Sequence, residues 1–199
     1  MKPINRYKLL GILFIAMAII IISYALANII GAKKELAKTL DDWEKNVEID
    51  LSENDEEETE NSIRYPSIEY GDTIGKLTFL DTELPIITGV EDSLLDEGVL
   101  HYGPTPLPGT NGNSILLGHR DSTFKNLKKL ELGQHFIIET KYNQFEFQIF
   151  DIKILKSDDT SVFDSYDFPT VSMETCYPFN YIGSAPKRYI VVGKLIKSY

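Results

Sequence analysis

The chain of 199 residues contains a single cysteine, Cys176, which is the first candidate for chemistry. A lone cysteine is more often a buried structural residue, because cysteine packs as a small apolar side chain. Cys176, however, stands at the end of a predicted strand within VSMETCYPF, where Pro178 stops strand pairing two residues later. A thiol at the end of a strand can face a cleft. The thiolate is the reactive form and a free thiol has a pKa of about 8.5, so catalysis needs a base or a cation beside it.

His119 and Arg188 are the candidates for that base and that cation. His119 ends the apolar run SILLGHR, and Arg188 begins the run RYIVVG twelve residues after Cys176. That interval has room for a loop and a returning antiparallel strand, which would bring Arg188 beside Cys176. The rigid, permanently charged fork of an arginine can hold a carbonyl or the oxyanion of a tetrahedral intermediate. A single histidine or arginine is more often structural, so the catalytic interpretation depends on the combination.

The other histidines and the second arginine of this region fit a catalytic role less well. His135 opens a strand after a turn and is expected to be solvated, whereas His101, in GVLHYGP, fits either a core or the wall of a cleft. Arg120 directly follows His119, and neighbours on a strand point to opposite faces. We therefore expect Arg120 not to share a pocket with His119.

The elements that must position these residues follow Pro66, where short apolar runs are broken by glycine, proline, asparagine and aspartate. This pattern predicts an all-β domain with short connections. Short helices are expected at residues 91–96 and 123–130. Eight strands are expected, a number that suits a closed β-barrel: 75–80, 84–88, 98–101, 114–119, 136–140, 145–154, 170–175 and 189–196.

An uncharged segment of 22 residues, from Leu9 to Ile30, is long enough to cross a bilayer at about 1.5 Å per residue. It is longer than the apolar core of a cleavable signal peptide, about 7 to 15 residues, so we expect an uncleaved transmembrane helix. Basic residues flank this span on both sides. The shortness of the tail, residues 1–8, favours a cytoplasmic N-terminus and an extracellular domain.

Residues 31–66 connect this membrane anchor to the expected barrel of residues 67–199. Residues 33–50 have apolar side chains at helical spacing, which predicts an amphipathic helix. Residues 52–61 are nearly all acidic, which predicts a solvated spacer. We interpret the whole connection as an acidic stalk. The formal net charge of −10 argues against a nucleic-acid partner, because such a protein needs a basic face.

Several separated motifs between Ile68 and the C-terminus resemble the sortase family, and most of all its class D members. LLGHR is similar to the histidine strand of sortases, and Arg188 stands where the family has an arginine after the cysteine. METC matches the family ending Thr-x-Thr-Cys in its last two residues only, with Ser172 where the family has threonine and Met173 at a position that is usually leucine. The more distinctive motifs are LPIITG, HYGPTPLPG, GHRDSTF and CYPFNYIGSAPKRYIVVG.

The resemblance implies an eight-stranded β-barrel and a transpeptidase that uses no cofactor. Cys176 would attack the threonine carbonyl of a C-terminal Leu-Pro-x-Thr-Gly sorting signal on a secreted protein and form a thioester. His119 would protonate the leaving amine and later deprotonate the incoming one, while Arg188 would orient the carbonyl and stabilise the oxyanion. The incoming amine would belong to a lipid-linked peptidoglycan precursor, as in cell-wall anchoring in Gram-positive bacteria. Thr175 is the expected supporting residue beside the nucleophile.

Residues 155–169 precede the strand that ends at Cys176 and are expected to form a wall of the substrate groove. Val162, Phe163 and Phe168 are the candidates for contact with the Leu-Pro part of the signal. The aspartates of this segment do not have the spacing of an EF-hand loop, so we expect a solvated loop and no metal site.

Three alternatives stay open. A cysteine peptidase would resolve the thioester with water instead of an amine. A pilin-polymerising sortase usually has a second membrane span and a lid with an Asp-Pro-aromatic motif; this chain shows no second apolar run and has Asp42-Trp43 without the proline, which we interpret as part of the stalk helix. An anchored binding protein with a structural cysteine would leave Cys176 inert to alkylation.

Overall fold

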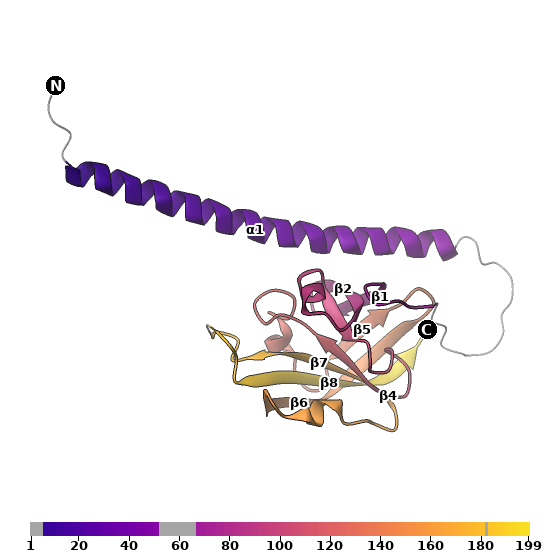
Figure 1. The fold of residues 1–199 in the computed structure, drawn as a ribbon. Helices are drawn as coiled ribbons and strands as arrows, with labels where there is room; N and C mark the ends of the chain where they lie inside the picture. Colours follow the sequence, from indigo (N-terminus) through magenta and orange to yellow (C-terminus); the bar gives the residue numbers. More distant parts are fainter. Residues whose placement is uncertain (1–5, 52–66, 182) are drawn as a thin grey trace.

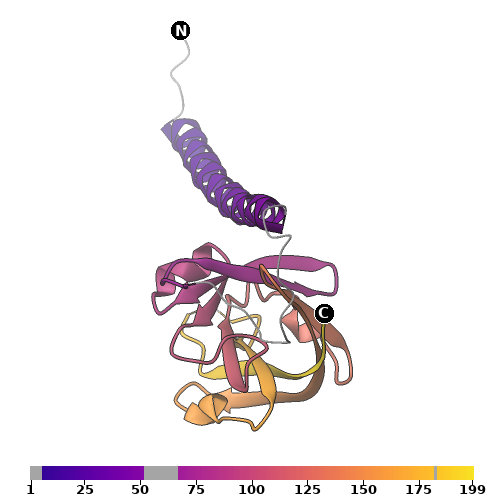
Figure 2. The same cartoon turned by 90° about the vertical axis from the view of Figure 1, so that its right-hand side faces the viewer.

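The computed structural model describes residues 6–51, 67–181 and 183–199 of the chain. A single long helix, α1 (Arg6–Leu51), lies along one side of a β-barrel that contains all the strands (Figures 1 and 2). The expected acidic spacer at 52–61 lies outside the described residues.

The barrel confirms the expected fold class. Its strands close in the order β1-β2-β3-β4-β7-β8-β6-β5, with parallel pairing only between β2 and β3 and between β4 and β7. Three short 3-10 helices are η1 (Asp92–Asp96), η2 (Leu127–Lys129) and η3 (Thr160–Phe163). The strands are β1 (Thr73–Phe79), β2 (Thr82–Gly89), β3 (Val99–Tyr102), β4 (Gly112–Leu117), β5 (His135–Glu139), β6 (Gln144–Lys156), β7 (Pro169–Tyr177) and β8 (Lys187–Ser198).

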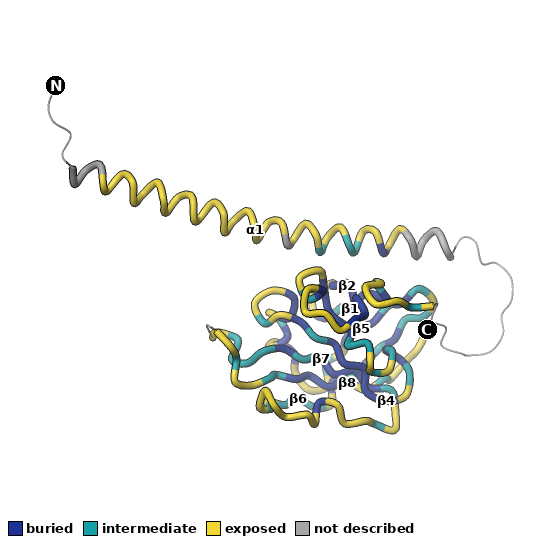
Figure 3. The backbone as a smooth tube through the Cα atoms, viewed as in Figure 1, coloured by how far each residue is buried: buried dark blue, intermediate teal, exposed yellow. Residues whose placement is uncertain are grey.

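The interior of the barrel is filled by apolar side chains from alternate strand positions, which Figure 3 shows as the buried segments of the strands. Phe136 and Phe147, which face each other across β5 and β6, stack with ring centroids 5.1 Å apart. Fully buried aromatic rings account for much of the filling: Phe79, Phe124, Phe136, Phe145 and Phe147. This packed core holds the ends of the strands in fixed relative positions.

The end of β4 differs from expectation in a way that matters for the site. The strand was expected to run to His119, but it ends at Leu117. A Cβ on Gly118 would lie 2.6 Å from the ring of Phe124, so glycine is required where this ring crosses the chain. The backbone N–H of His119 then donates to Thr123 Oγ1 at 2.9 Å. His119 therefore begins a turn instead of ending a strand, and the helix expected at 123–130 is reduced to turns and η2.

Helix α1 joins the expected apolar span and the expected amphipathic helix without a break. It is the one helix of the described residues that is long and apolar enough to cross a membrane. Its apolar part is exposed along its length, whereas Trp43 is buried (Figure 3). The later part of α1 contacts β1 and β2, so this portion of the expected stalk lies against the barrel instead of standing clear of it.

Candidate active site

Strands β7 and β8 place Cys176 directly beside Arg188. The two strands are antiparallel neighbours, and in their register Cys176 is the Cα partner of Arg188. Side chains of directly opposed residues lie on the same face of a sheet, with Cβ atoms about 4.5–5.5 Å apart. The thiol is free and half-buried. The expected return of the chain after Cys176 thus brings a permanent positive charge beside the thiol.

His119 reaches the same end of the barrel from β4, which runs parallel to β7. Leu117 is paired with Glu174, so a continuation by two residues brings His119 level with Cys176. Two hydrogen bonds hold the chain there: Gly118 N–H donates to Glu174 O at 3.2 Å, and Thr175 Oγ1 donates to Gly118 O at 2.7 Å. Thr175 is buried and thus supports the site by fixing the segment that carries His119.

The imidazole of His119 is close to a carboxylate that the sequence did not single out. Its Nε2 lies 3.4 Å from Asp96 Oδ1 at the end of η1. The carboxylate is 81% exposed, and exposed ion pairs contribute little free energy. The contact therefore orients His119 only weakly, and the ring can turn towards a substrate without a large cost.

Arg188 is held by a second unforeseen carboxylate, Glu174. Its Nε lies 3.3 Å from Glu174 Oε1, and its Nη1 donates to the carbonyls of Ala185 and Lys187 at 3.2 and 3.1 Å. Burial raises the pKa of Glu174, and the charge of Arg188 opposes this rise. Glu174 stands two residues before Cys176, so the two side chains lie on the same face of the strand. This spacing is the only signal in the sequence that could have indicated the contact of Glu174 with Arg188.

A groove of about 300 Å³ runs from this ion pair along the barrel surface. Its charged lining residues are Arg188, Glu174, Asp158 and Asp159. Cys176 lies near the end of β7 and His119 follows β4 at the same end of the barrel, but neither lines the groove. Its walls are mostly apolar and come from β3, β4, β6, β8 and η3: Tyr102, Ile115, Leu117, Leu155, Val162, Phe163 and Ile190. The arrangement can hold an extended apolar segment with one end at Arg188, the strand neighbour of Cys176.

The segment expected to form the groove wall does so in part. Val162 and Phe163 line the groove, and the buried amide of Asn113 fixes η3 by donating to Val162 O at 2.7 Å. Ser172 in turn donates to Asn113 Oδ1 at 2.8 Å. Phe168 packs elsewhere, against the rings of Phe150 and Tyr166. Of the three apolar candidates, the structure brings two to the groove.

Similarity to known proteins decides the family. The family model described as "Sortase domain" matches residues 76–196. Sortase D of Bacillus subtilis (strain 168) is 31% identical over 195 residues, which cover 95% of this chain and 98% of that protein. The chain belongs to the sortase family.

Solved sortase structures share the fold. The Sortase D5 transpeptidase of Clostridium perfringens matches with a TM-score of 0.62 and 26% identity, covering 83% of this chain and 98% of that one. Sortase C1 of Streptococcus agalactiae matches with a TM-score of 0.58 and 28% identity, covering 63% and 68%. Cys176, His119 and Arg188 all lie within the residues that match the sortase domain.

The remaining histidines of this sortase domain have structural surroundings. His101 is buried, with Nδ1 2.9 Å from Thr88 Oγ1 and Nε2 3.1 Å from Pro106 O. His101 therefore belongs to the core and not to a cleft wall, and its burial lowers its pKa. His135 is exposed as expected, and its Nδ1 lies 2.7 Å from Glu146 Oε1. Arg120 donates to the backbone carbonyls of Tyr181 and Gly183 in the β7–β8 loop.

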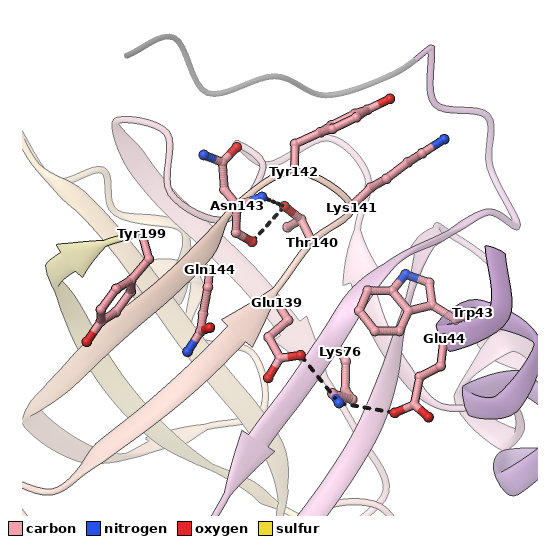
Figure 4. A pocket seen from close by; sticks show the side chains of 10 residues that line it. All are labelled: Trp43, Glu44, Lys76, Glu139, Thr140, Lys141, Tyr142, Asn143, Gln144 and Tyr199. Atoms are coloured by element: carbon pink, nitrogen blue, oxygen red, sulfur yellow. Dashed lines mark hydrogen bonds and ion pairs between the residues drawn. The ribbon is translucent and has the colours of Figure 1, made fainter. Parts of the chain in front are cut away.

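A larger hollow of about 520 Å³ lies on the other side of the sortase barrel, under α1 (Figure 4). Lys76 is surrounded there by carboxylates and by the ring of Trp43. Neither Arg188 nor any residue next to Cys176 or His119 in sequence lines this hollow, whereas the smaller groove contains Arg188 and Glu174. Within the described ranges, no group of three or more histidine, cysteine, aspartate or glutamate residues is placed to hold a metal ion.

Proposed function

We propose that the chain is a membrane-anchored cysteine transpeptidase that cleaves a Leu-Pro-x-Thr-Gly sorting signal between threonine and glycine. The observation that carries this proposal is the register that sets Cys176 opposite Arg188 and level with His119. A nucleophile, a proton carrier and a fixed cation at one strand end are the parts that acyl transfer through a thioester needs. Secreted proteins that carry such signals are the proposed substrates.

The apolar groove supports this substrate class. A leucine and a proline are apolar and would be removed from water against Val162, Phe163 and the neighbouring aliphatic side chains. The signal would then run towards Arg188 and present its threonine carbonyl to Cys176. Phe168 packs against other rings, so its proposed substrate contact would depend on movement of this segment.

In the first half of the reaction, the Cys176 thiolate attacks the carbonyl carbon of the signal's threonine. The carbonyl oxygen becomes an oxyanion, which Arg188 stabilises with its donors; the guanidinium has five N–H groups, and three contacts are formed among the described residues. The C–N bond then breaks as His119 gives its proton to the glycine amine. The products are a thioester on Cys176 and a free C-terminal peptide.

In the second half, an amine attacks the thioester. His119, now neutral, takes a proton from this amine, the new peptide bond forms, and the thiolate of Cys176 leaves. His119 must turn from Asp96 towards the sulfur in both halves, and catalytic hydrogen bonds often tighten only when substrate is bound. A lipid-linked peptidoglycan precursor is the proposed source of the amine, because α1 would hold the domain at the outer face of the membrane.

The proposal is tested with the full chain in detergent micelles and a small library of sorting-signal peptides. Mass spectrometry should find cleavage after threonine and, with added amine, a product that carries the amine. The Cys176→Ala variant is the control and should give neither product. Cleavage with no amine adduct at any amine concentration would favour the peptidase alternative. A Cys176 thiol inert to a small alkylating reagent in the folded chain would refute the catalytic role altogether.

A further inference from the structure

Helix α1 is fixed to the barrel by a contact formed by Leu36, Trp43 and Glu44, called here the docking contact. Leu36 packs against the edge of the main core. The buried ring of Trp43 lies 5.8 Å from Lys76 Nζ, and Glu44 Oε1 lies 3.1 Å from the same nitrogen (Figure 4). These residues span more than two turns of α1, so they fix the direction of the helix against β1 and β2 as well as its position.

The direction of α1 determines which end of the barrel is nearer to the membrane. In Figure 1, β8 runs in the same direction as α1, from the side of the N-terminus towards the C-terminus of the chain. The first residues of β8 and the β7–β8 loop therefore lie at the end of the barrel that points towards the apolar half of α1. The C-terminal residue Tyr199 lies at the opposite end (Figure 1).

The end that points towards the membrane span has side chains suited to a lipid headgroup region. The β7–β8 loop contributes the exposed ring of Tyr181 and the partly buried ring of Phe179, which packs against the core and lies 5.5 Å from the charged head of Lys128. Arg120 lies 5.8 Å from the Tyr181 ring and donates to Tyr181 O at 2.7 Å. Together with Lys187, these residues are called here the β7–β8 rim.

The charge of the rim contrasts with that of the whole chain. The chain has a formal net charge of −10, yet the charged side chains of the rim, Arg120, Lys128 and Lys187, are all basic. The exposed carboxylate of Asp96, beside His119, lies at the same end of the barrel. Aromatic rings that combine an apolar body with a polar tip are enriched at membrane interfaces, and lysine and arginine are attracted to anionic lipids. Tyr181 is 46% exposed, so its ring is available for such a contact.

We propose that the β7–β8 rim contacts the anionic headgroup region of the bilayer and that the docking contact holds it there. This proposal presupposes the membrane anchoring by α1 that is proposed above, but not the transpeptidation chemistry. Cys176, His119 and Arg188 lie at the same end of the barrel as the rim. The active site then opens along the membrane surface, where a lipid-linked amine and a membrane-retained substrate would both be found.

The test uses the full chain in a Cys176→Ala background, reconstituted in vesicles of phosphatidylcholine and phosphatidylglycerol. A single labelling site is introduced by Tyr181→Cys or, as the matched control at the other end of β8, by Tyr199→Cys; Tyr199 is 58% exposed. Each variant carries an environment-sensitive fluorophore, and quenching by headgroup-labelled lipid is measured. The label at 181 should be quenched and its emission shifted to the blue, whereas the label at 199 should show neither effect.

Four further outcomes separate the parts of the proposal. Equal quenching at both positions in vesicle-bound chain overturns the rim contact, whereas chain that does not float with the vesicles overturns the membrane anchoring itself. Addition of Trp43→Ala should reduce quenching at 181 while near-ultraviolet circular dichroism stays that of a folded barrel; unchanged quenching overturns the role of the docking contact. Equal quenching in vesicles without phosphatidylglycerol overturns the part assigned to the basic side chains.

Discussion

Two partly buried cations of the barrel, Lys76 and Arg188, differ in how completely carboxylates match their charge. The Lys76 side chain is 11% exposed, and its Nζ lies 3.1, 3.3 and 4.0 Å from Glu44, Glu139 and Glu83. The Arg188 side chain is 30% exposed and has an ion pair with Glu174 alone, counted over the described residues. The first cation is surrounded by more negative charge than it carries, and the second is not.

This difference separates a structural ion cluster from the one that we propose to be catalytic. Burial acts to lower the pKa of Lys76, but the hydrogen bond to Glu44 and the charges of Glu139 and Glu83 outweigh it, so the pKa stands above its ordinary value. Lys76 thus joins α1, β1 and β5 and has a structural role. Arg188 keeps donors for a developing oxyanion. Substitutions near Arg188 should therefore change the rate, and substitutions near Lys76 should change the stability.

The largest effect on rate is expected from Cys176→Ala. Transfer and thioester formation should both disappear, because no other thiol is present in the sequence. The side chain is half-buried at a strand end, so the free energy of unfolding should stay close to that of the unmodified chain. Peptide turnover and chemical denaturation measure the two quantities. Residual amine transfer by this variant would contradict the assigned nucleophile.

The next largest effect is expected from His119→Ala. Loss of the general acid and base should lower kcat/KM by about a hundred- to ten-thousand-fold. His135→Ala is the matched control, because His135 is also exposed and also contacts a carboxylate, but lies on β5. This control should turn over peptide at a normal rate. A similar loss in both variants would mean that His119 acts on the fold and not on the reaction.

Arg188→Ala should lower kcat/KM by about a hundred- to a thousand-fold, the range for removal of an oxyanion donor. Arg188→Lys should recover only part of this loss, because an ammonium cannot reproduce the planar fork. Lys187→Ala is the control, since it removes the neighbouring positive charge from the opposite face of β8. Full activity of Arg188→Ala on a sorting-signal peptide would refute the proposed role of Arg188 in catalysis. Its role would then be structural, like that of Lys76.

Much of this arrangement follows from local sequence pattern. Each of the eight strands has its own apolar run and its own turn residues, so their number and approximate bounds could be predicted. The interval between Cys176 and Arg188 is short enough that a hairpin is the simplest connection, and the register agrees. The position of His119 at the same end could be predicted too, although the strand before it is shorter than expected.

The parts that could not be predicted depend on contacts between distant segments. β4 ends early because the ring of Phe124 crosses Gly118, which no pattern within β4 reveals. Glu174 contacts Arg188 only because of the exact pairing of β7 and β8, and a shift by one residue would turn it away. The sequence pattern around Trp43 predicts a helix that stands clear of the barrel. Its contact with the barrel could not be predicted, because the partner Lys76 belongs to another element of the chain.

In the ion cluster around Lys76, the Lys76→Met variant should leave peptide turnover nearly normal and lower the free energy of unfolding by about 1–2 kcal/mol. The three carboxylates would then repel one another without a cation, but their own exposure to solvent limits the cost. Lys194→Met, at an exposed position of β8, is the control and should have little effect. A large loss of rate with normal stability would reverse the proposed division between the two clusters.

The smallest effect is expected from Glu174→Gln, and its sign depends on pH. Burial raises the pKa of Glu174 in the folded chain above its unfolded value, so between these two values the folded state binds more protons. The contribution of Glu174 to stability therefore falls as the pH rises through that window. Glutamine has no such dependence, so the variant should gain stability relative to the unmodified chain as the pH rises from acid to neutral.

The same variant tests how Glu174 affects Arg188. Glutamine can still accept a hydrogen bond from Arg188 Nε but carries no charge, so kcat/KM at neutral pH should change by about tenfold or less, within 1.36 kcal/mol. Unfolding followed by denaturant at several pH values measures the stability, and peptide turnover measures the rate. A loss of rate as large as that of Arg188→Ala would show that the charge of Glu174 is required to position the guanidinium. Arg188 would then depend on its carboxylate partner as Lys76 depends on its own.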